Sequence, residues 1–138
     1  MVFKEQPCIN YYETSKKDIY IYDEKIENYG EKEKFIISNP KQTRYGDIYG
    51  WDKGLIKFDN NNPTKEDIVV IGESFDNTII ELISEHFNIT YSIDVRHYKD
   101  ENGNKFNITE FAKNNNVDKI LLIGKIDFLI DKEHSFNN

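Results

Sequence analysis

The segment Gly72-Glu73-Ser74-Phe75-Asp76-Asn77 carries residue types that suit acyl-transfer chemistry. A serine at the corner between a strand and a helix points its hydroxyl into the crevice above the sheet. Unpaired main-chain N–H groups there favour a developing oxyanion. Ser74 is therefore a candidate nucleophile, flanked by Gly72, Glu73 and Asn77 as candidate binding residues. Serine is also a preferred helix N-cap residue, and a glycine before it suits a tight turn, so a purely structural role stays open.

A nucleophilic serine needs a base within hydrogen-bond reach, because its hydroxyl is almost fully protonated at neutral pH. The chain has three histidines. His86 lies twelve residues after Ser74, which is about 18 Å along a helix, so we expect it to be too far away. An imidazole nitrogen within about 3.5 Å of the Ser74 hydroxyl would favour catalysis.

The other two histidines each follow an aspartate by three positions, as Asp94/His97 and Asp131/His134. Asp94 and His97 come at the carboxyl end of a predicted strand, which is where ligands of parallel sheets bind. Asp131 and His134 lie in a polar C-terminal stretch of the kind that is often poorly ordered. Either histidine is a candidate base, and surface or packing roles are the alternative.

Arg96 is one of two arginines in the chain and lies two positions after Asp94. Residues at this spacing on a strand share a face. They could form a structural ion pair or meet an anionic substrate group such as a carboxylate.

Composition limits the class of protein. The 138 residues are 38% hydrophobic with a formal net charge of −7, which suits one globular domain and disfavours a nucleic-acid partner. No apolar run is long enough to span a membrane, and no signal peptide is recognisable at the N-terminus. A single cysteine, Cys8, allows neither an internal disulfide nor a cysteine zinc site. We expect no metal and no cofactor.

The second half of the chain alternates strand and helix patterns. Continuous apolar runs predict buried strands near 67–72 and 119–124, and residues 89–94 between them have strand character. Helical spacing predicts an amphipathic helix over 75–87, with Glu81 and Glu85 outward and an apolar inward face. That face comprises Phe75, Ile79, Leu82, Ile83 and Phe87. A second helix is predicted over 108–116, capped by Asn107 or Thr109. This order implies right-handed crossovers and a parallel sheet, with ligands at the strand ends near residues 72–74, 94–96 and 124–125.

The first half has a different pattern. Short β-branched and aromatic runs at 18–22, 34–38 and 55–58 predict antiparallel hairpins, and its many tyrosines suit strand packing or, as the alternative, sugar stacking. We therefore predict one domain over 1–138. It comprises a β-hairpin-rich segment over 1–60, a parallel βαβαβ core over 64–130 and a polar tail over 131–138.

Four segments resemble a known superfamily. Residues 68–77 resemble the serine block of SGNH (GDSL-type) hydrolases. Residues 89–98, with Asp94, Arg96 and Tyr98, resemble the Asp-x-Arg-x-Tyr strand of DHHW-type proteins, relatives of the alginate O-acetyltransferase-like group. Residues 111–123 are similar to the next helix and strand of that group, and residues 45–54 are similar to its glycine-rich aromatic hairpin. The likeness covers roughly residues 43 to 130.

The resemblance implies an α/β fold with a three-layer, SGNH- or flavodoxin-like parallel sheet, extended or covered by the N-terminal β-rich segment. Ser74 takes the nucleophile position. Two departures matter. Glu73 replaces the family's aspartate, and the expected Asp-x-His motif upstream of the serine is absent, because residues 1–73 contain no histidine. On this pattern the chain resembles the C-terminal portion of such a protein.

Two functions follow. The first is an SGNH-like esterase or O-acyltransferase-type domain acting on acylated carbohydrate or another ester, incomplete or inactive as this chain. The alternative is a non-catalytic carbohydrate- or protein-binding module that keeps the fold. The resemblance implies an extracellular or cell-surface location, and the sequence does not define an oligomeric state.

Overall fold

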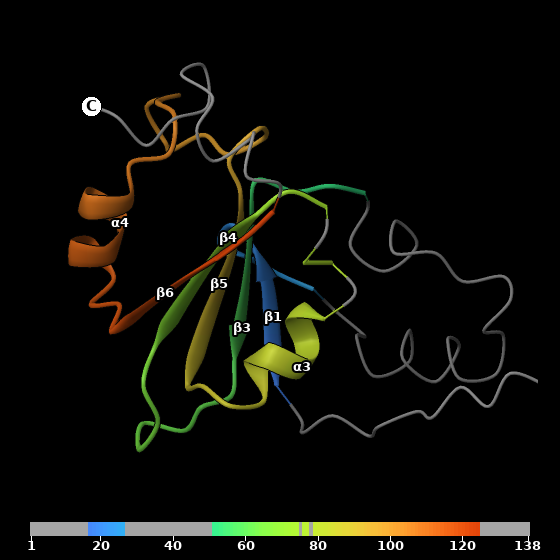
Figure 1. The fold of residues 1–138 in the computed structure, drawn as a ribbon, viewed down its shortest axis with the longest axis vertical. Helices are drawn as coiled ribbons and strands as arrows, with labels where there is room; N and C mark the ends of the chain where they lie inside the picture. The colour runs from blue at the N-terminus through green and yellow to red at the C-terminus, as the bar shows by residue number, and fades with distance from the viewer. Residues whose placement is uncertain (1–16, 27–50, 75, 78, 125–138) are drawn as a thin grey trace, which may run out of the picture.

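A computed structural model describes residues 17–26, 51–74, 76–77 and 79–124. Its elements, in chain order, are β1 (Asp18–Ile21), β2 (Glu24–Lys25), β3 (Leu55–Asp59), β4 (Ile68–Gly72), α3 (Ile80–Ser84), β5 (Ile89–Asp94), α4 (Ile108–Asn114) and β6 (Lys119–Ile123) (Figure 1). The strand expected at 34–38, Cys8 and the Asp131/His134 pair lie outside the described residues.

The described strands form one six-stranded mixed sheet in the order β2-β1-β3-β5-β4-β6. β4 pairs in parallel with β5 and with β6, which confirms the three predicted parallel strands. β1, β2 and β3 pair antiparallel and join the sheet through β5. The N-terminal β-rich segment therefore extends the sheet, which is α/β but not parallel throughout.

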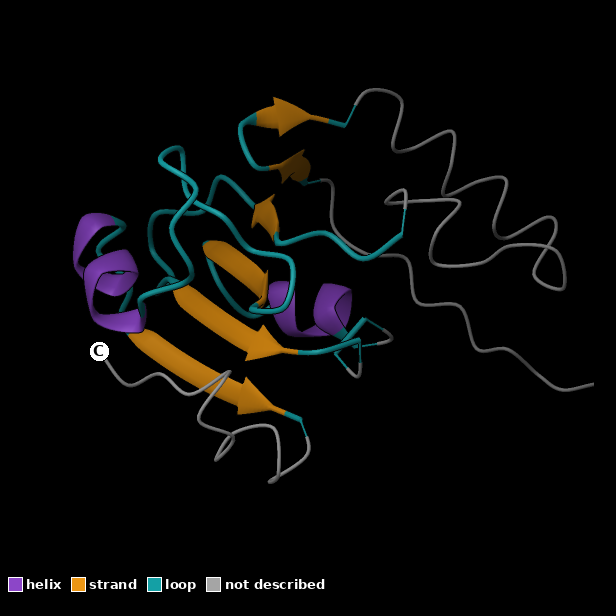
Figure 2. Cartoon of the chain, turned by 90° about the horizontal axis from the view of Figure 1, so that it is seen from above, coloured by secondary structure: helices purple, strands orange, loops and turns teal. Residues whose placement is uncertain are grey.

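Two apolar clusters, one on each face of the sheet, form the core. Along β4, which is buried throughout, Ile68 and Val70 pack in one cluster with Ile80 of α3. Val69 and Ile71 pack in the other with Phe111 of α4. Successive strand residues point to opposite faces, so each helix covers a different face, as Figure 2 shows. This explains why the strand reads as a continuous apolar run.

Helix α3 is shorter than the predicted helix over 75–87, because it begins at Ile80 and ends at Ser84. The main-chain oxygen of Asp76 accepts hydrogen bonds from the N–H groups of Ile79 and Ile80, both at 2.9 Å, so turns occupy the described residues just before the helix. The inward face also differs from the prediction. Ile80 is buried, whereas Ile79 and Leu82, expected inside, are 41% and 47% exposed.

A buried lysine holds the C-terminal end of α3 against the sheet. The Lys17 side chain is 1% exposed. Its Nζ donates to Ser84 Oγ at 2.8 Å, to Glu85 Oε1 at 2.5 Å and to the main-chain oxygen of Glu81 at 3.3 Å. A cation near the carbonyl end of a helix is favourable, since it meets the negative end of the helix dipole. Glu85, expected to point outward, is thus an ion-pair partner.

Helix α4 matches its prediction closely. The Asn107 side chain accepts a hydrogen bond from the N–H of Glu110 at 3.0 Å, so Asn107, not Thr109, is the N-cap residue. Phe111 turns inward and meets Tyr91 of β5 edge to face, with ring centroids 5.2 Å apart.

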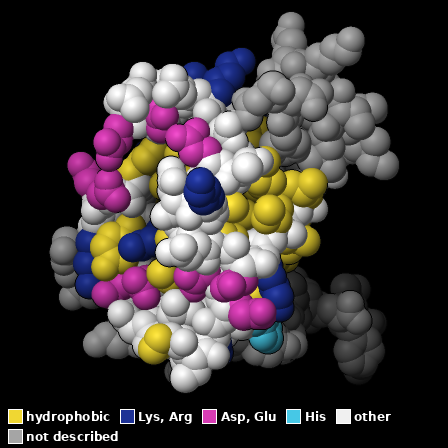
Figure 3. Space-filling model, turned by 90° about the vertical axis from the view of Figure 1, so that its left-hand side faces the viewer, with side chains coloured by type: hydrophobic (Ala, Val, Ile, Leu, Met, Phe, Trp, Pro, Cys, Tyr) yellow, Lys and Arg dark blue, Asp and Glu magenta, His cyan; other side chains and the backbone are white. Residues whose placement is uncertain are grey.

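Strand β6 was predicted to be buried, and this is wrong. Ile120, Leu121 and Leu122 are 50%, 37% and 44% exposed, because β6 ends the described sheet and has one strand partner there, β4. Figure 3 views the molecule from the side that bears α4, where exposed hydrophobic side chains lie among acidic ones. No helix among the described residues is long and apolar enough to cross a membrane.

Candidate functional site

The carboxyl ends of the parallel strands lie level, as the alternation predicted. Gly72 of β4 is the direct partner of Asp94 in β5 and of Ile123 in β6. β3 runs antiparallel to β5, so its first residue lies at the same edge, where Leu55 faces Ile93. The turn after β4, the turn after β5 and the loop before β3 therefore meet around one edge of the sheet.

Ser74 lies in the turn directly after β4, and its side chain is exposed. The strand-then-turn placement expected of a nucleophile is present. Two other expectations are wrong, because helix α3 begins six residues later. Ser74 is not the N-cap, a position held by Ile79 without a side-chain hydrogen bond. The unpaired N–H groups and the dipole of α3 are therefore not beside the Ser74 hydroxyl.

Arg96 organises the same edge through two carboxylates. Its Nε donates to Asp94 Oδ1 at 2.9 Å and its Nη2 to Asp94 Oδ2 at 2.5 Å. Nη2 also contacts Asp52 Oδ2 at 3.3 Å. Asn77 Nδ2 donates to the other Asp52 oxygen at 3.3 Å. The predicted Asp94–Arg96 ion pair therefore exists, and Asp52 extends it to the Ser74 turn.

These contacts also affect the charge on Arg96. The hydrogen bond with Asp94 raises the pKa of the Arg96 guanidinium above its ordinary value, partial burial opposes this, and the charges of Asp94, Asp52 and Glu73 reinforce it. Glu73, a candidate binding residue, thus belongs to the electrostatic surroundings of Arg96. The guanidinium stays charged and neutralises part of an acidic edge.

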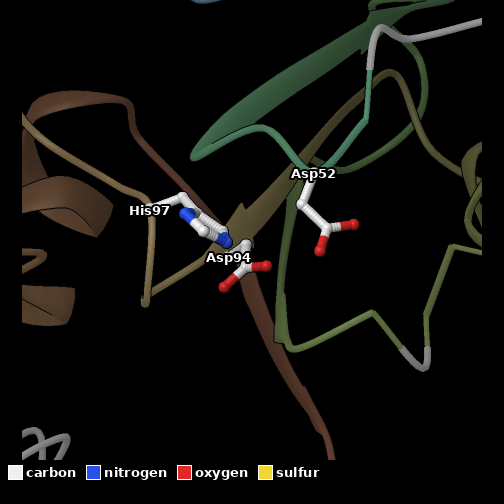
Figure 4. A group of neighbouring side chains, drawn as sticks. All are labelled: Asp52, Asp94 and His97. Atoms are coloured by element: carbon white, nitrogen blue, oxygen red, sulfur yellow. The ribbon is translucent and has the colours of Figure 1, made fainter. Parts of the chain in front are cut away.

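His97 lies in the turn after β5, and its ring is a neighbour of the Asp52 and Asp94 side chains (Figure 4). One ring nitrogen of His97 and one carboxylate oxygen each from Asp52 and Asp94 all lie within 4.8 Å of one another. A carboxylate beside an imidazole can orient the ring and stabilise its protonated form. Among the described residues no hydrogen bond joins His97 to Ser74, a contact that tightens in many enzymes only when substrate binds.

The same three side chains are of types that bind metal ions. Arg96, however, occupies both carboxylate oxygens of Asp94 and one of Asp52. A cation at this place would be repelled by the positively charged guanidinium and would have to share oxygens that already accept its N–H groups. The donor set as arranged therefore fits an ion-pair cluster rather than a metal centre.

Gly54 fixes the place of the turn that carries His97. A Cβ atom at Gly54 would lie 2.5 Å from the Cα of Tyr98 and 2.7 Å from the main-chain oxygen of His97. The oxygen of Gly54 also accepts a hydrogen bond from the N–H of Asp94 at 3.1 Å. Only a residue without a side chain allows the two main chains to approach so closely.

Asp76 is a buried acid beneath the Ser74 turn. It is 2% exposed, and its Oδ2 accepts a hydrogen bond from Ser92 Oγ at 3.1 Å. Burial raises the pKa of Asp76 to about 6. The Ser92 hydrogen bond acts against this shift, and the charges of Asp94 and Arg96 have smaller, opposing effects.

Sequence reasoning missed Asp52 and Asp76. Asp76 stands two positions after Ser74 within the segment already singled out, and an acid at that place was the available signal. Asp52 lies in the glycine-rich stretch before β3, and nothing in its spacing marked it. Its role follows from the antiparallel pairing of β3 with β5.

A separate hollow of about 440 Å³ lies between α4 and the loop that leads to it. Tyr98, Phe106 and Phe111 line one part, and polar side chains including Asp100 and Glu110 line the rest. None of the residues of the Ser74 turn borders this hollow.

Comparison with protein-family models and with curated proteins finds no match. Solved structures with a similar fold include PatB1 of Bacillus cereus with a sulfonyl adduct, at 25% identity and a TM-score of 0.55, over 70% of this chain and 31% of that one. A second PatB1 structure gives 24% identity, a TM-score of 0.55, and 69% and 30% coverage.

A DHHW family protein from Eubacterium siraeum is also similar, with 14% identity and a TM-score of 0.56, over 88% of this chain and 39% of that protein. The chain thus spans between about a third and two fifths of the length of these proteins. Its α/β fold is similar to that of PatB1 and of a DHHW family protein, which supports the resemblance seen in the sequence at the level of the fold.

Proposed function

We propose that the chain is an SGNH-like domain of the esterase or O-acyltransferase type, with Ser74 as its nucleophile and a three-layer arrangement of its sheet and helices. The observation that carries this proposal is the exposed Ser74 in the turn after β4, because the neighbouring strand β5 ends level with β4 and is followed by His97, which has a ring nitrogen within 4.8 Å of an Asp94 carboxylate oxygen. The fold shared with PatB1 supports it.

In this proposal the Ser74 hydroxyl attacks the carbonyl carbon of an ester, and His97 takes the hydroxyl proton as the base. Asp94 orients the imidazole and stabilises its charged form, as the acid of a serine triad does. Main-chain N–H groups near Ser74, in the turn after β4, hold the oxyanion. The tetrahedral intermediate then expels the alcohol of the ester, which takes the proton from His97, and the acyl group stays on Ser74. Water or an acceptor hydroxyl, such as that of a carbohydrate, next attacks this acyl group, gives its proton to His97 and releases Ser74.

We expect low activity from this chain, for two reasons. Arg96 already engages Asp94, which weakens the hold of Asp94 on His97. The helix dipole that would assist an oxyanion is also remote from Ser74. A slow rate is therefore the expected property of the site.

A covalent label can test the nucleophile before the substrate is identified. Sulfonyl fluorides modify activated nucleophilic side chains, and PatB1 has been solved with a sulfonyl adduct. We expect phenylmethylsulfonyl fluoride to add one mass label to the wild type, mapped by peptide mass spectrometry to Ser74. Ser74→Ala should remain unlabelled, and Thr109→Ala, which removes an exposed hydroxyl from α4, should label normally.

Hydrolysis of p-nitrophenyl acetate tests activity with the same variants. Ser74→Ala and His97→Asn should each lower the rate towards the uncatalysed background, whereas Thr109→Ala should not. Equal rates for wild type and Ser74→Ala would remove the nucleophile assignment.

A second candidate function is a non-catalytic binding module. The hollow beside α4 favours it, because three aromatic rings and several polar groups border a space of about 440 Å³, and small-molecule sites combine these features. Absence of labelling at Ser74, together with binding of a carbohydrate that Phe106→Ala abolishes, would support this function instead.

A further inference from the structure

The Asp76 side chain links the turn that carries Ser74 to the neighbouring strand. Its carboxyl group accepts the Ser92 hydroxyl of β5 at 3.1 Å. The same group lies against the last residue of β4, since a Cβ atom at Gly72 would be 3.0 Å from Asp76 Cγ. The turn after β4 therefore closes over a carboxyl group that is buried against two strands.

The Asp76 main chain links the same turn to α3. Its carbonyl oxygen accepts hydrogen bonds from the N–H groups of Ile79 and Ile80, each at 2.9 Å. Displacement of Asp76 would therefore break the contact with Ser92 and the bonds that start the helix together. The two amides report directly on whether the turn is closed.

The surroundings of Asp76 provide little compensation for a negative charge. The groups that act on it are the Ser92 hydroxyl and the main chain of Asp76 itself, which form hydrogen bonds with the carboxyl group, the Asp94 carboxylate, which opposes a second charge, and Arg96, which attracts one. Arg96 is already paired with Asp94 and Asp52. An ionised carboxyl in a buried place without a cation of its own is costly. Opening of the turn to water relieves this cost.

We propose that Asp76 is a pH-sensitive positioning residue for the Ser74 turn, closed over a neutral carboxyl group and opening more readily once that group loses its proton. The proposal rests on the proposed function only in that this turn carries the nucleophile. It implies that the turn that carries Ser74 opens least at acidic pH, where Asp76 keeps its proton. Asp76 itself acts through the turn and does not contact the ester.

Amide hydrogen exchange measured by NMR tests this proposal without any assay of activity. For Ile79 and Ile80, corrected for intrinsic exchange rates, we expect the opening equilibrium of the wild type to rise roughly tenfold from pH 5 to pH 7.5. This follows because the carboxyl group titrates near 6 when closed, against 3.8 when open. The amide of Val70 in β4 serves as an internal reference for global opening.

Three variants complete the test. Asp76→Asn keeps an acceptor for Ser92 but has no charge, so its opening equilibrium should not change with pH. Ser92→Ala removes the hydrogen bond that lowers the pKa of Asp76, so the rise in the opening equilibrium should continue to higher pH than in the wild type. Asp118→Asn, at the opposite end of the strands, should behave as the wild type.

A wild type without this pH dependence, or an Asp76→Asn variant that retains it, overturns the proposal. These outcomes are separate from the labelling of Ser74. If the turn opens with pH as expected but Ser74 takes no sulfonyl label, the role of Asp76 is supported and the proposed function is contradicted.

Discussion

Arg96 and Asp52, which are 44 positions apart in the chain, lie 3.3 Å from each other through Nη2 and Oδ2. Their contact joins the loop before β3 to the turn after β5, and Asn77 extends it to the turn after β4. Three segments that are distant in sequence are thus held at one edge of the sheet by partly exposed polar groups.

This network predicts a difference between two conservative substitutions. Arg96→Lys removes the two-pronged contact with Asp94, which an ammonium group cannot reproduce. We expect it to lower the free energy of unfolding by about 1 kcal/mol. Asp52→Asn loses one long, partly exposed contact and should cost less, at most about 0.5 kcal/mol. Urea denaturation at pH 7 measures both, and the opposite order would contradict the assignment of Asp94 as the main partner.

Adding a single methyl group at Gly72 is expected to lower the stability of the fold strongly. A Cβ atom there would lie 3.0 Å from Asp76 Cγ and 3.0 Å from the main-chain oxygen of Ile123. Because the second neighbour is backbone, Gly72→Ala should lower the free energy of unfolding by roughly 1–3 kcal/mol. Gly124→Ala is the matched control, since no atom of the described residues lies within 4 Å of its added Cβ. Similar denaturation midpoints for the two variants would refute the tight contact.

The buried ammonium group of Lys17 is expected to contribute to the free energy of unfolding. Lys17→Met keeps most of the side-chain volume but removes the bonds to Ser84 and Glu85. We expect the free energy of unfolding to fall by about 2 kcal/mol or more. The reason is that removing the cation of a buried ion pair leaves its acceptor without a partner. Lys119→Met removes a half-exposed ion pair with Glu66 and should cost less than about 1 kcal/mol. Thermal and urea unfolding should give the same order.

Asp76 predicts the sign of a pH effect on stability. Its pKa is raised from 3.8 to about 6 in the folded protein, so the folded state binds this proton more tightly than the unfolded state. Stability from this group is complete below pH 3.8 and is lost as the pH rises through 6. Relative to the wild type, Asp76→Asn should gain about 3 kcal/mol between pH 3 and pH 7.5. Urea denaturation across that range checks this value, and a constant difference would exclude it.

Much of the parallel core could be predicted, because its signals are local. The continuous apolar run at 67–72 predicted a buried strand, the strand character of 89–94 predicted its neighbour, and Asn107 predicted a helix cap. The burial of strand β6 was predicted wrongly, since an apolar run does not reveal that the strand ends the described sheet. The start of helix α3 was predicted wrongly as well. Apolar spacing favoured helix from residue 75, but the main-chain oxygen of Asp76 binds the first helical N–H groups.

The site was partly predictable for a related reason. Ser74, Asp94, Arg96 and His97 follow strands, and parallel strands carry such residues to a shared edge. Asp52 depends instead on an antiparallel pairing between distant segments, for which the sequence has no local signal. The burial of Asp76 depends on Ser92 of another strand, so it too required the tertiary structure.

The close approach of two main chains at Gly54 restricts which residue related sequences can carry at this position. Because any side chain there would meet the main chain of His97 and Tyr98, descendants that keep the turn in place must keep glycine at 54, whatever they carry at 97. Sequences with a larger residue at that position should have moved the turn. Glycine at 54 is therefore a marker, readable from a genome, of members whose histidine position is still comparable.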